Sequence, residues 1–204
     1  MMPKPRPRLK IVLSVLLSAF ILWQFGSAAK IHAKALLAQY LIAHSWQQAL
    51  EHPEQPLETY KPWSWADTWP VARMQWIGKA GEVTRPDADV WVLSGADGSS
   101  LAFGPGHLHG TAMPGEGATV FAGHRDTHFQ FLQAAQVGDL LRVQTRQGLW
   151  LQYQVAHVSI VDSAKKQLRL DVNSKDLWLV TCYPFNGVSA GGTLRYQLRA
   201  KAVF

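Results

Sequence analysis

The first long apolar stretch of the chain lies near its start. Between Lys10 and Lys30 there are 19 residues without a charged side chain, and residues 11–25 are strongly apolar. As a helix, this stretch is roughly 28 Å long, which is close to the hydrocarbon thickness of a bilayer. Because basic residues precede it, we expect an uncleaved signal anchor that leaves the following chain on the outer side of the membrane. The alternatives are a cleaved signal peptide ending at the small residues 26–28, and a buried helix of a soluble domain.

After this stretch the pattern changes from helical to one rich in proline and tryptophan. Apolar residues keep a helical spacing over residues 28–50, without a helix breaker. Four prolines between positions 53 and 70 then exclude a long helix, and Trp63, Trp65 and Trp69 cluster there. We expect this segment to be a linker packed against the domain that follows. The alternative is an aromatic belt at the membrane surface.

The rest of the chain has the pattern of an all-β domain. Short runs of strand-forming residues recur, and glycine and proline turns separate most of them. Such spacing predicts a closed barrel or a sandwich, with one helical turn at residues 127–135. The eight expected strands are residues 72–77, 90–93, 100–103, 119–122, 140–145, 149–161, 177–181 and 194–204.

Together, these patterns divide the chain into four parts. They are a basic cytoplasmic tail (1–10), a signal-anchor helix (11–29), an amphipathic helix with the linker (30–70) and a β-barrel (71–204). The net charge is +6, but four of the 20 basic residues lie in the tail. The rest of the chain has 16 basic and 14 acidic residues. No dense basic stripe with interleaved aromatic residues remains, so we expect no nucleic-acid partner.

Cys182 is the only cysteine in the chain, and it occupies a strand end. The apolar residues 177–180 precede it, while Pro184 and the Asn186-Gly187 turn signal follow it. A thiol held on a rigid strand and opening onto a loop is well placed for nucleophilic chemistry. The alternative is a buried structural cysteine that behaves as a small hydrophobic residue.

Two further residues stand at positions like that of Cys182. His124 follows the short apolar strand 119–122, and Arg195 begins the last expected strand. If that last strand pairs antiparallel with the cysteine strand, Arg195 lies near Cys182. Arg199 and Lys201 share its face, and we expect both to be solvated.

Other histidines carry weaker signals. His124 and His128 are four residues apart and could form a metal pair, but no Glu occupies the position that zinc proteases use, so we expect no metal site. The His107-x-His109 pair lies in a Gly/Pro-rich loop, where we expect a structural residue or the wall of a cleft.

Three motifs, in this order, resemble those of the sortases: AGHRDTHF at 122–129, LVTC at 179–182 and LRY at 194–196. Sortases are membrane-anchored cysteine transpeptidases with an eight-stranded β-barrel, and the resemblance covers about residues 70–204. The Trp-rich segment 62–73 resembles the proteobacterial branch called class GN, whose members usually work beside one dedicated substrate protein. Many sortases carry Thr where this chain has Trp178, which alters the expected pocket shape but not the chemistry.

The resemblance implies a specific reaction. Sortases cut an exported protein at a C-terminal signal such as Leu-Pro-x-Thr-Gly, between Thr and Gly, and pass the acyl group to an amine. Cys182 would be the nucleophile, His124 the general acid and base, and Arg195 the oxyanion donor. Thr181, Trp178 and His107 would bind the substrate. The resemblance implies no cofactor, and it places the domain on the periplasmic side of the inner membrane.

Two other functions compete with this interpretation. An L,D-transpeptidase is also exported, β-rich and cysteine-dependent, but its Ser-x-Gly-Cys-x-Arg motif does not fit the residues around Cys182. A non-catalytic, membrane-anchored barrel that binds peptides would not need Cys, His and Arg together at strand ends.

Overall fold

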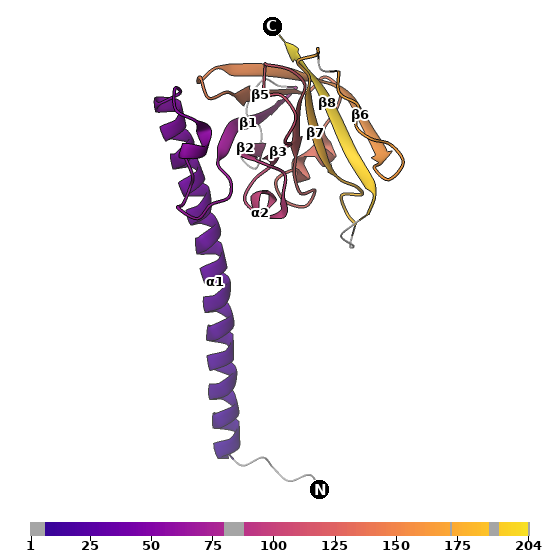
Figure 1. Ribbon diagram of the computed structural model, residues 1–204. Helices are drawn as coiled ribbons and strands as arrows, with labels where there is room; N and C mark the ends of the chain where they lie inside the picture. Colours follow the sequence, from indigo (N-terminus) through magenta and orange to yellow (C-terminus); the bar gives the residue numbers. More distant parts are fainter. Residues whose placement is uncertain (1–6, 80–87, 172, 188–191, 204) are drawn as a thin grey trace. The chain divides into compact units, whose positions relative to one another are not determined.

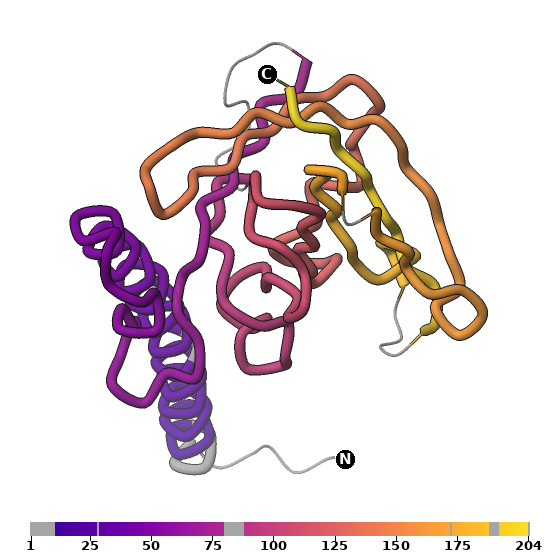
Figure 2. The backbone as a smooth tube through the Cα atoms, turned by 45° about the horizontal axis from the view of Figure 1, so that its top comes forward, coloured from indigo at the N-terminus to yellow at the C-terminus, as the bar shows by residue number. Residues whose placement is uncertain are grey.

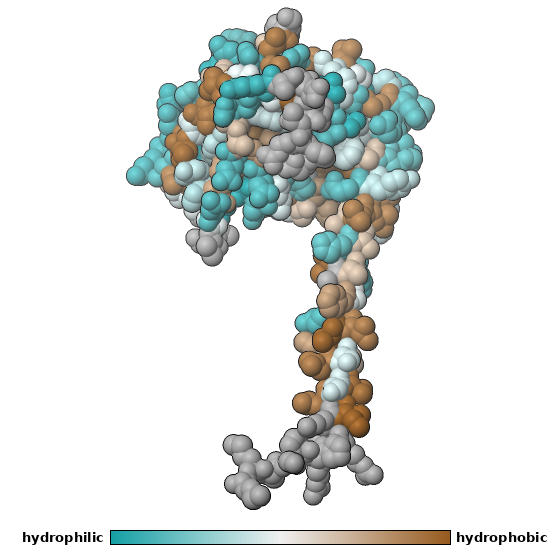
Figure 3. All heavy atoms as spheres, turned by 180° about the vertical axis from the view of Figure 1, so that it is seen from behind, coloured by the Kyte–Doolittle hydropathy of each residue, from teal (hydrophilic) through white to brown (hydrophobic). Residues whose placement is uncertain are grey.

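The computed structural model describes residues 7–79, 88–171, 173–187 and 192–203 (Figure 1). It divides into two compact units, Met1–Tyr40 and Leu41–Phe204. The first unit consists of the greater part of helix α1 (Pro7–Glu51). Its large apolar side chains are exposed, and Figure 3 shows them along this helix. In the part of the chain that the structure describes, α1 is the one helix long and apolar enough to cross a membrane.

The second unit begins with the last turns of α1, which are buried. Ile42, Trp46 and Ala49 are at most 1% exposed, and Trp46 Nε1 donates a hydrogen bond of 3.1 Å to Gln144 Oε1. The proline-rich segment that follows contains only the short helix η1 (Leu57–Thr59). Leu57, Tyr60 and Ala66 bury their side chains in the second unit, so this segment packs on the domain.

The second unit is a closed barrel of eight strands, in the order β1-β2-β3-β4-β7-β8-β6-β5. This confirms the all-β fold with a closed eight-stranded barrel, short helices and a preceding apolar helix. Figure 2 traces the backbone around it. The strands are β1 (Pro70–Gly78), β2 (Asp89–Ser94), β3 (Gly106–His107), β4 (Thr119–Ala122), β5 (Leu140–Gln144), β6 (Trp150–Asp162), β7 (Leu177–Cys182) and β8 (Leu194–Val203).

One expected strand was wrong. Residues 100–103 are not extended, because helix α2 (Gly98–Leu101) occupies this part, and the third strand is the two-residue β3. At Gly106 a Cβ atom would lie 2.0 Å from the carbonyl oxygen of Gly95, so only glycine allows this close approach of the two backbones. The strand was missed because a pattern of side chains cannot indicate a strand built on a glycine.

The remaining expectations for the barrel agree with the structure. The other seven runs match observed strands, apart from residue 204, which lies outside the described residues. The expected helical turn is the short helix η3 (Gln130–Ala134). The core is formed by the alternate, inward-facing residues of the strands, such as Leu179 of β7 and Leu198 of β8, which are register partners and both fully buried.

Candidate active site

Cys182 and Arg195 are direct cross-strand partners. Cys182 ends β7, Arg195 lies at the start of β8, and the two strands pair antiparallel with these residues in register. Along β7 the residues Leu177, Leu179 and Thr181 are buried, so Cys182 belongs to the alternate, outward face. Directly paired residues project to the same side of a sheet. The last strand therefore pairs antiparallel with the cysteine strand, which was the condition for Arg195 to lie near Cys182.

His124 is carried to the same end of the sheet by the strand on the other side of β7. Strand β4 pairs parallel with β7, and Ala122 is the register partner of Val180. The Gly123 N–H then donates to the Val180 carbonyl at 3.1 Å, which continues the pairing one residue further. His124 comes next and is exposed. The ends of β4 and β7 and the beginning of β8 thus bring His124, Cys182 and Arg195 to one edge of the barrel.

Two side chains tie the histidine loop to the cysteine strand and its following loop. The hydroxyl of Thr181 donates to the Gly123 carbonyl at 2.7 Å, and Thr181 is only 3% exposed. The Arg125 guanidinium donates to the Gly187 carbonyl at 2.6 Å. Thr181 was expected to bind substrate, but the contact it makes is within the chain. Arg125 was not singled out in the sequence, although it directly follows His124 in the same motif.

The guanidinium of Arg195 folds toward its own end of the strand. Its Nη1 donates to the carbonyls of Gly192 at 2.5 Å and Leu194 at 3.0 Å. These bonds hold the guanidinium against the start of β8. A guanidinium has five N–H donors in a rigid fork, so two bonds from one nitrogen leave donors for a further acceptor.

His107 is held inside the fold as part of β3. Its Nε2 lies 3.1 Å from the Ala112 carbonyl and 3.0 Å from the Thr111 hydroxyl, which itself donates to the Leu108 carbonyl. The carbonyl can only accept, and the Thr111 hydroxyl hydrogen is already donated to Leu108, so this arrangement favours the tautomer with the proton on Nε2. Burial lowers the pKa of His107, an effect that the bond to Ala112 partly opposes. The neutral ring thus supports the loop that leads to β4.

His128 lies close enough to His124 for the two imidazoles to interact electrostatically. Burial lowers the pKa of His128, a hydrogen bond with the backbone of Ala102 opposes this, and electrostatic interaction with His124 lowers the pKa further. Among the described residues, no group of three His, Cys, Asp or Glu side chains could hold a metal ion.

Trp178 shares the outward face of β7 with Cys182, four residues before it. The Arg199 guanidinium lies 5.7 Å from the indole ring centre, and Arg199 Nη2 pairs with Asp176 Oδ2 at 2.6 Å. The expectation that Arg199 is simply solvated was therefore wrong. It failed because Asp176, which precedes β7 and is 9% exposed in its side chain, needs a cation beside it.

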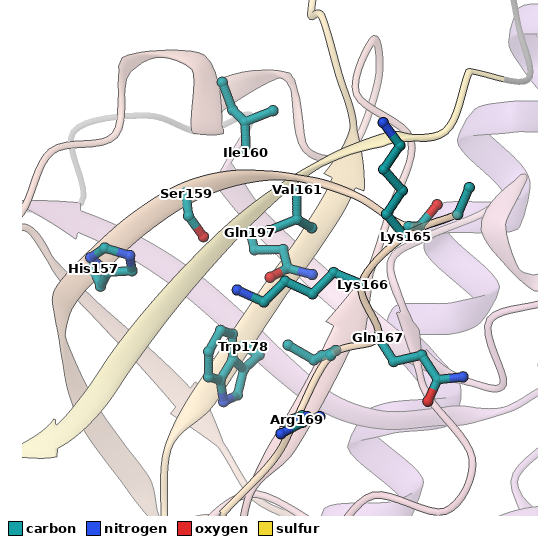
Figure 4. Close-up of a pocket in the computed structure, with 13 residues that line it drawn as sticks. His157, Ser159, Ile160, Val161, Lys165, Lys166, Gln167, Arg169, Trp178 and Gln197 are labelled. Atoms are coloured by element: carbon teal, nitrogen blue, oxygen red, sulfur yellow. The ribbon is translucent and has the colours of Figure 1, made fainter.

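A pocket of about 950 Å³ lies over this outward face (Figure 4). Strands β6 and β8 line it together with Trp178 and the connection between β6 and β7. Trp178 Nε1 is buried and has no hydrogen-bond partner in the described part of the chain. The exposed part of the indole therefore gives the pocket an aromatic wall on the same strand as Cys182.

Comparisons with known proteins identify relatives of this domain. The family model "Sortase domain" matches residues 82–203. Sortase D of Bacillus subtilis (strain 168) is 32% identical over 124 residues, which are 60% of this chain and 62% of that protein. The matched part thus spans less than two thirds of that relative.

Solved structures share the fold. A Clostridium perfringens Sortase D5 transpeptidase aligns with a TM-score of 0.59 at 21% identity, over 81% of this chain and 99% of that chain. Sortase A from Corynebacterium diphtheriae aligns with a TM-score of 0.57 at 23% identity, over 82% of this chain and 84% of that chain.

Proposed function

Because the chain belongs to the sortase family, whose transpeptidases are cysteine enzymes, we propose that Cys182 is the nucleophile of a membrane-anchored transpeptidase. Its substrate is an exported protein with a C-terminal signal similar to Leu-Pro-x-Thr-Gly. The observation that carries this proposal is the meeting of three strand ends, which places Cys182 in register with Arg195 and beside the His124 loop.

The first half of the reaction breaks the Thr–Gly peptide bond. The Cys182 thiolate attacks the Thr carbonyl carbon, and a carbon–sulfur bond forms. His124, in its protonated form, gives a proton to the leaving glycine nitrogen, so that a neutral amine departs and a thioester remains. In the second half, His124 accepts a proton from the incoming amine. The amine then replaces the thiolate and forms a new amide bond.

Arg195 stabilises the negative charge that develops within each of these two halves. The tetrahedral intermediate carries an oxyanion on the former carbonyl oxygen, close to the residue that faces Cys182 across the strand pair. A guanidinium is always charged and has spare donors beyond the two bonds that anchor its Nη1. A preorganised donor of this kind lowers the barrier without reorganisation during the reaction.

We also propose a location and a subclass. The exposed apolar residues of α1 support a single-pass anchor (residues 11–29) in the inner membrane, with the basic tail (1–10) in the cytoplasm. The linker region (30–70) and the barrel (71–204) then lie on the periplasmic side. The resemblance of the Trp-rich segment 62–73 to class GN supports assignment to that class, which implies one dedicated substrate protein.

Mass spectrometry tests the reaction directly. The full-length protein in detergent is incubated with a Leu-Pro-Ala-Thr-Gly peptide, and an adduct carrying the acyl part on Cys182 is the expected product. Cys182→Ala removes one sulfur atom and should abolish both adduct and cleavage without changing the melting temperature. Cleavage by Cys182→Ala within a few-fold of the parent rate would show that another residue is the nucleophile.

A further inference from the structure

The pocket over β6 and β8 has an uneven distribution of charge. Three of its lining residues are cations, namely Lys165, Lys166 and Arg169, and none of its lining residues is acidic. Lys165 already pairs with Asp162 at 3.7 Å. Lys166 and Arg169 are exposed and have no acidic partner within the described residues. The pocket therefore has two uncompensated positive charges.

These cations face an apolar and aromatic floor. Ile160, Val161, Leu168 and Trp178 also line the pocket. In Figure 4 the Lys166 side chain extends toward Trp178, and Arg169 lies on the same side as the indole ring. A site of this composition fits a short segment with one apolar side chain and one carboxylate, since each part then meets a complementary surface.

The strand register places this pocket at a defined distance from Cys182. Val161, Arg195 and Cys182 form one row across β6, β8 and β7, so Val161 is two strand spacings, or about 10 Å, from Cys182. Trp178 is four residues back along β7, or about 13 Å. An extended peptide advances about 3.3 Å per residue, so the pocket lies three to four residues from the carbonyl that Cys182 attacks.

The order of the strands also indicates which part of the substrate reaches the pocket, the segment before or after the cleaved bond. Strand β7 lies between β4, which leads to His124, and β8, which borders the pocket. If His124 protonates the leaving amine, the leaving segment lies on the β4 side. The acyl segment, N-terminal to the cleaved bond, then extends across the β8 side and into the pocket.

We propose that this pocket selects an acidic side chain in the acyl segment, four residues before the attacked carbonyl. In a Leu-Pro-x-Thr-Gly signal this is the residue directly before Leu, and Leu itself, three residues before, packs on the apolar part of the pocket around Val161. Lys166 and Arg169 bind the carboxylate. This inference rests on the proposed function, because it uses the roles of Cys182 and His124.

The test uses three peptides of the form Xaa-Leu-Pro-Ala-Thr-Gly, in which Xaa is Glu, Gln or Lys. The protein is the full chain in detergent, in the parent form, in a double variant with Lys166→Glu and Arg169→Glu, and in a control double variant with Lys61→Glu and Lys201→Glu. The control reverses two exposed charges that do not line the pocket. Two readouts are measured: acylation of Cys182, and peptide binding to the same proteins carrying Cys182→Ala.

The parent should bind and acylate the Glu peptide about fivefold better than the Gln peptide, and the Lys peptide should be the poorest. This magnitude is that of two partly exposed ion pairs. The preference should shrink in high salt, reverse in the pocket variant and persist in the control variant. Equal binding of the three peptides, or equal behaviour of the two double variants, would overturn the inference. A charge preference in binding without acylation of Cys182 would support the pocket and contradict the proposed function.

Discussion

The hydrogen bond between Thr181 and Gly123 provides a sharp test of how the site is positioned. Thr181 Oγ1 donates to the Gly123 carbonyl at 2.7 Å, and Gly123 immediately precedes His124. Thr181→Val keeps the shape of the buried side chain but removes the donor. The buried carbonyl then loses a partner, which costs about 1–3 kcal/mol of unfolding free energy. For a domain of this size, that loss lowers the melting temperature by roughly 2–10 °C.

The effect on activity should be larger than this loss of stability explains. A domain with about 5 kcal/mol of stability that loses 2 kcal/mol still remains roughly 99% folded at 25 °C. Unfolding alone would therefore leave the rate almost unchanged. A histidine displaced by about 1 Å can slow the reaction up to about 100-fold. We expect Thr181→Val to lower kcat/KM by about 10- to 100-fold, and Thr181→Ser to restore most of it because it keeps the hydroxyl.

Thr119 offers a matched control at the other end of the same strand pair. It is fully buried on β4, and its hydroxyl donates to the Gly117 carbonyl at 3.2 Å. Thr119→Val should lower the melting temperature to a similar extent and leave kcat/KM within about twofold. The assay is peptide cleavage at 25 °C, with urea unfolding curves for each variant. If Thr181→Val and Thr119→Val lose equal activity, the bond to Gly123 does not position His124.

Three further variants test the surrounding residues. Arg195→Ala should lower kcat/KM by roughly 10²–10³, the effect of losing an oxyanion donor, and Arg195→Lys should restore little; a loss no greater than that of Lys201→Ala would reject the oxyanion role. Arg199→Ala should leave Asp176 without its ion-pair partner and cost about 1–3 kcal/mol of unfolding free energy, which urea unfolding measures; an unchanged curve would show that the pair contributes nothing. Burial lowers the pKa of His107, so the unfolded chain takes up a proton first as the pH falls below about 6.5. Stability should therefore be highest above that pH and decline below it, with a smaller decline in His107→Gln; identical pH profiles would exclude His107 as a cause.

Local sequence patterns were sufficient to predict the strands that have one buried face and one outward face. In β7 the residues Leu177, Leu179 and Thr181 are buried and alternate with outward-facing ones, as expected for a strand with one face on the core. The strand-to-loop positions of Cys182 and His124 could also be predicted, because the flanking Pro, Gly and Asn residues end strands for local steric reasons. The helix over residues 28–50 followed equally from its spacing.

Local sequence patterns could not predict which distant segments pair with each other. The parallel contact of β4 with β7 joins residues far apart in sequence, and no local pattern encodes it. The same holds for the bond from Arg125 to Gly187 and for the ion pair of Arg199 with Asp176, because each needs a partner that only the closed barrel brings near. Strand β3 was missed because its glycine is required by a neighbouring backbone rather than by its own pattern.

The sequence by itself determined which residue types stand at strand ends, since turn and strand propensities act over a few residues. It also determined the apolar length of the first helix, because that length depends only on consecutive side chains. Only the tertiary structure decided that Cys182 faces Arg195, that Thr181 bonds to the His124 loop and that Lys166 and Arg169 line one pocket with Trp178. These relations depend on strand order and register, which arise when the whole barrel closes around one core and every strand must bury the same face.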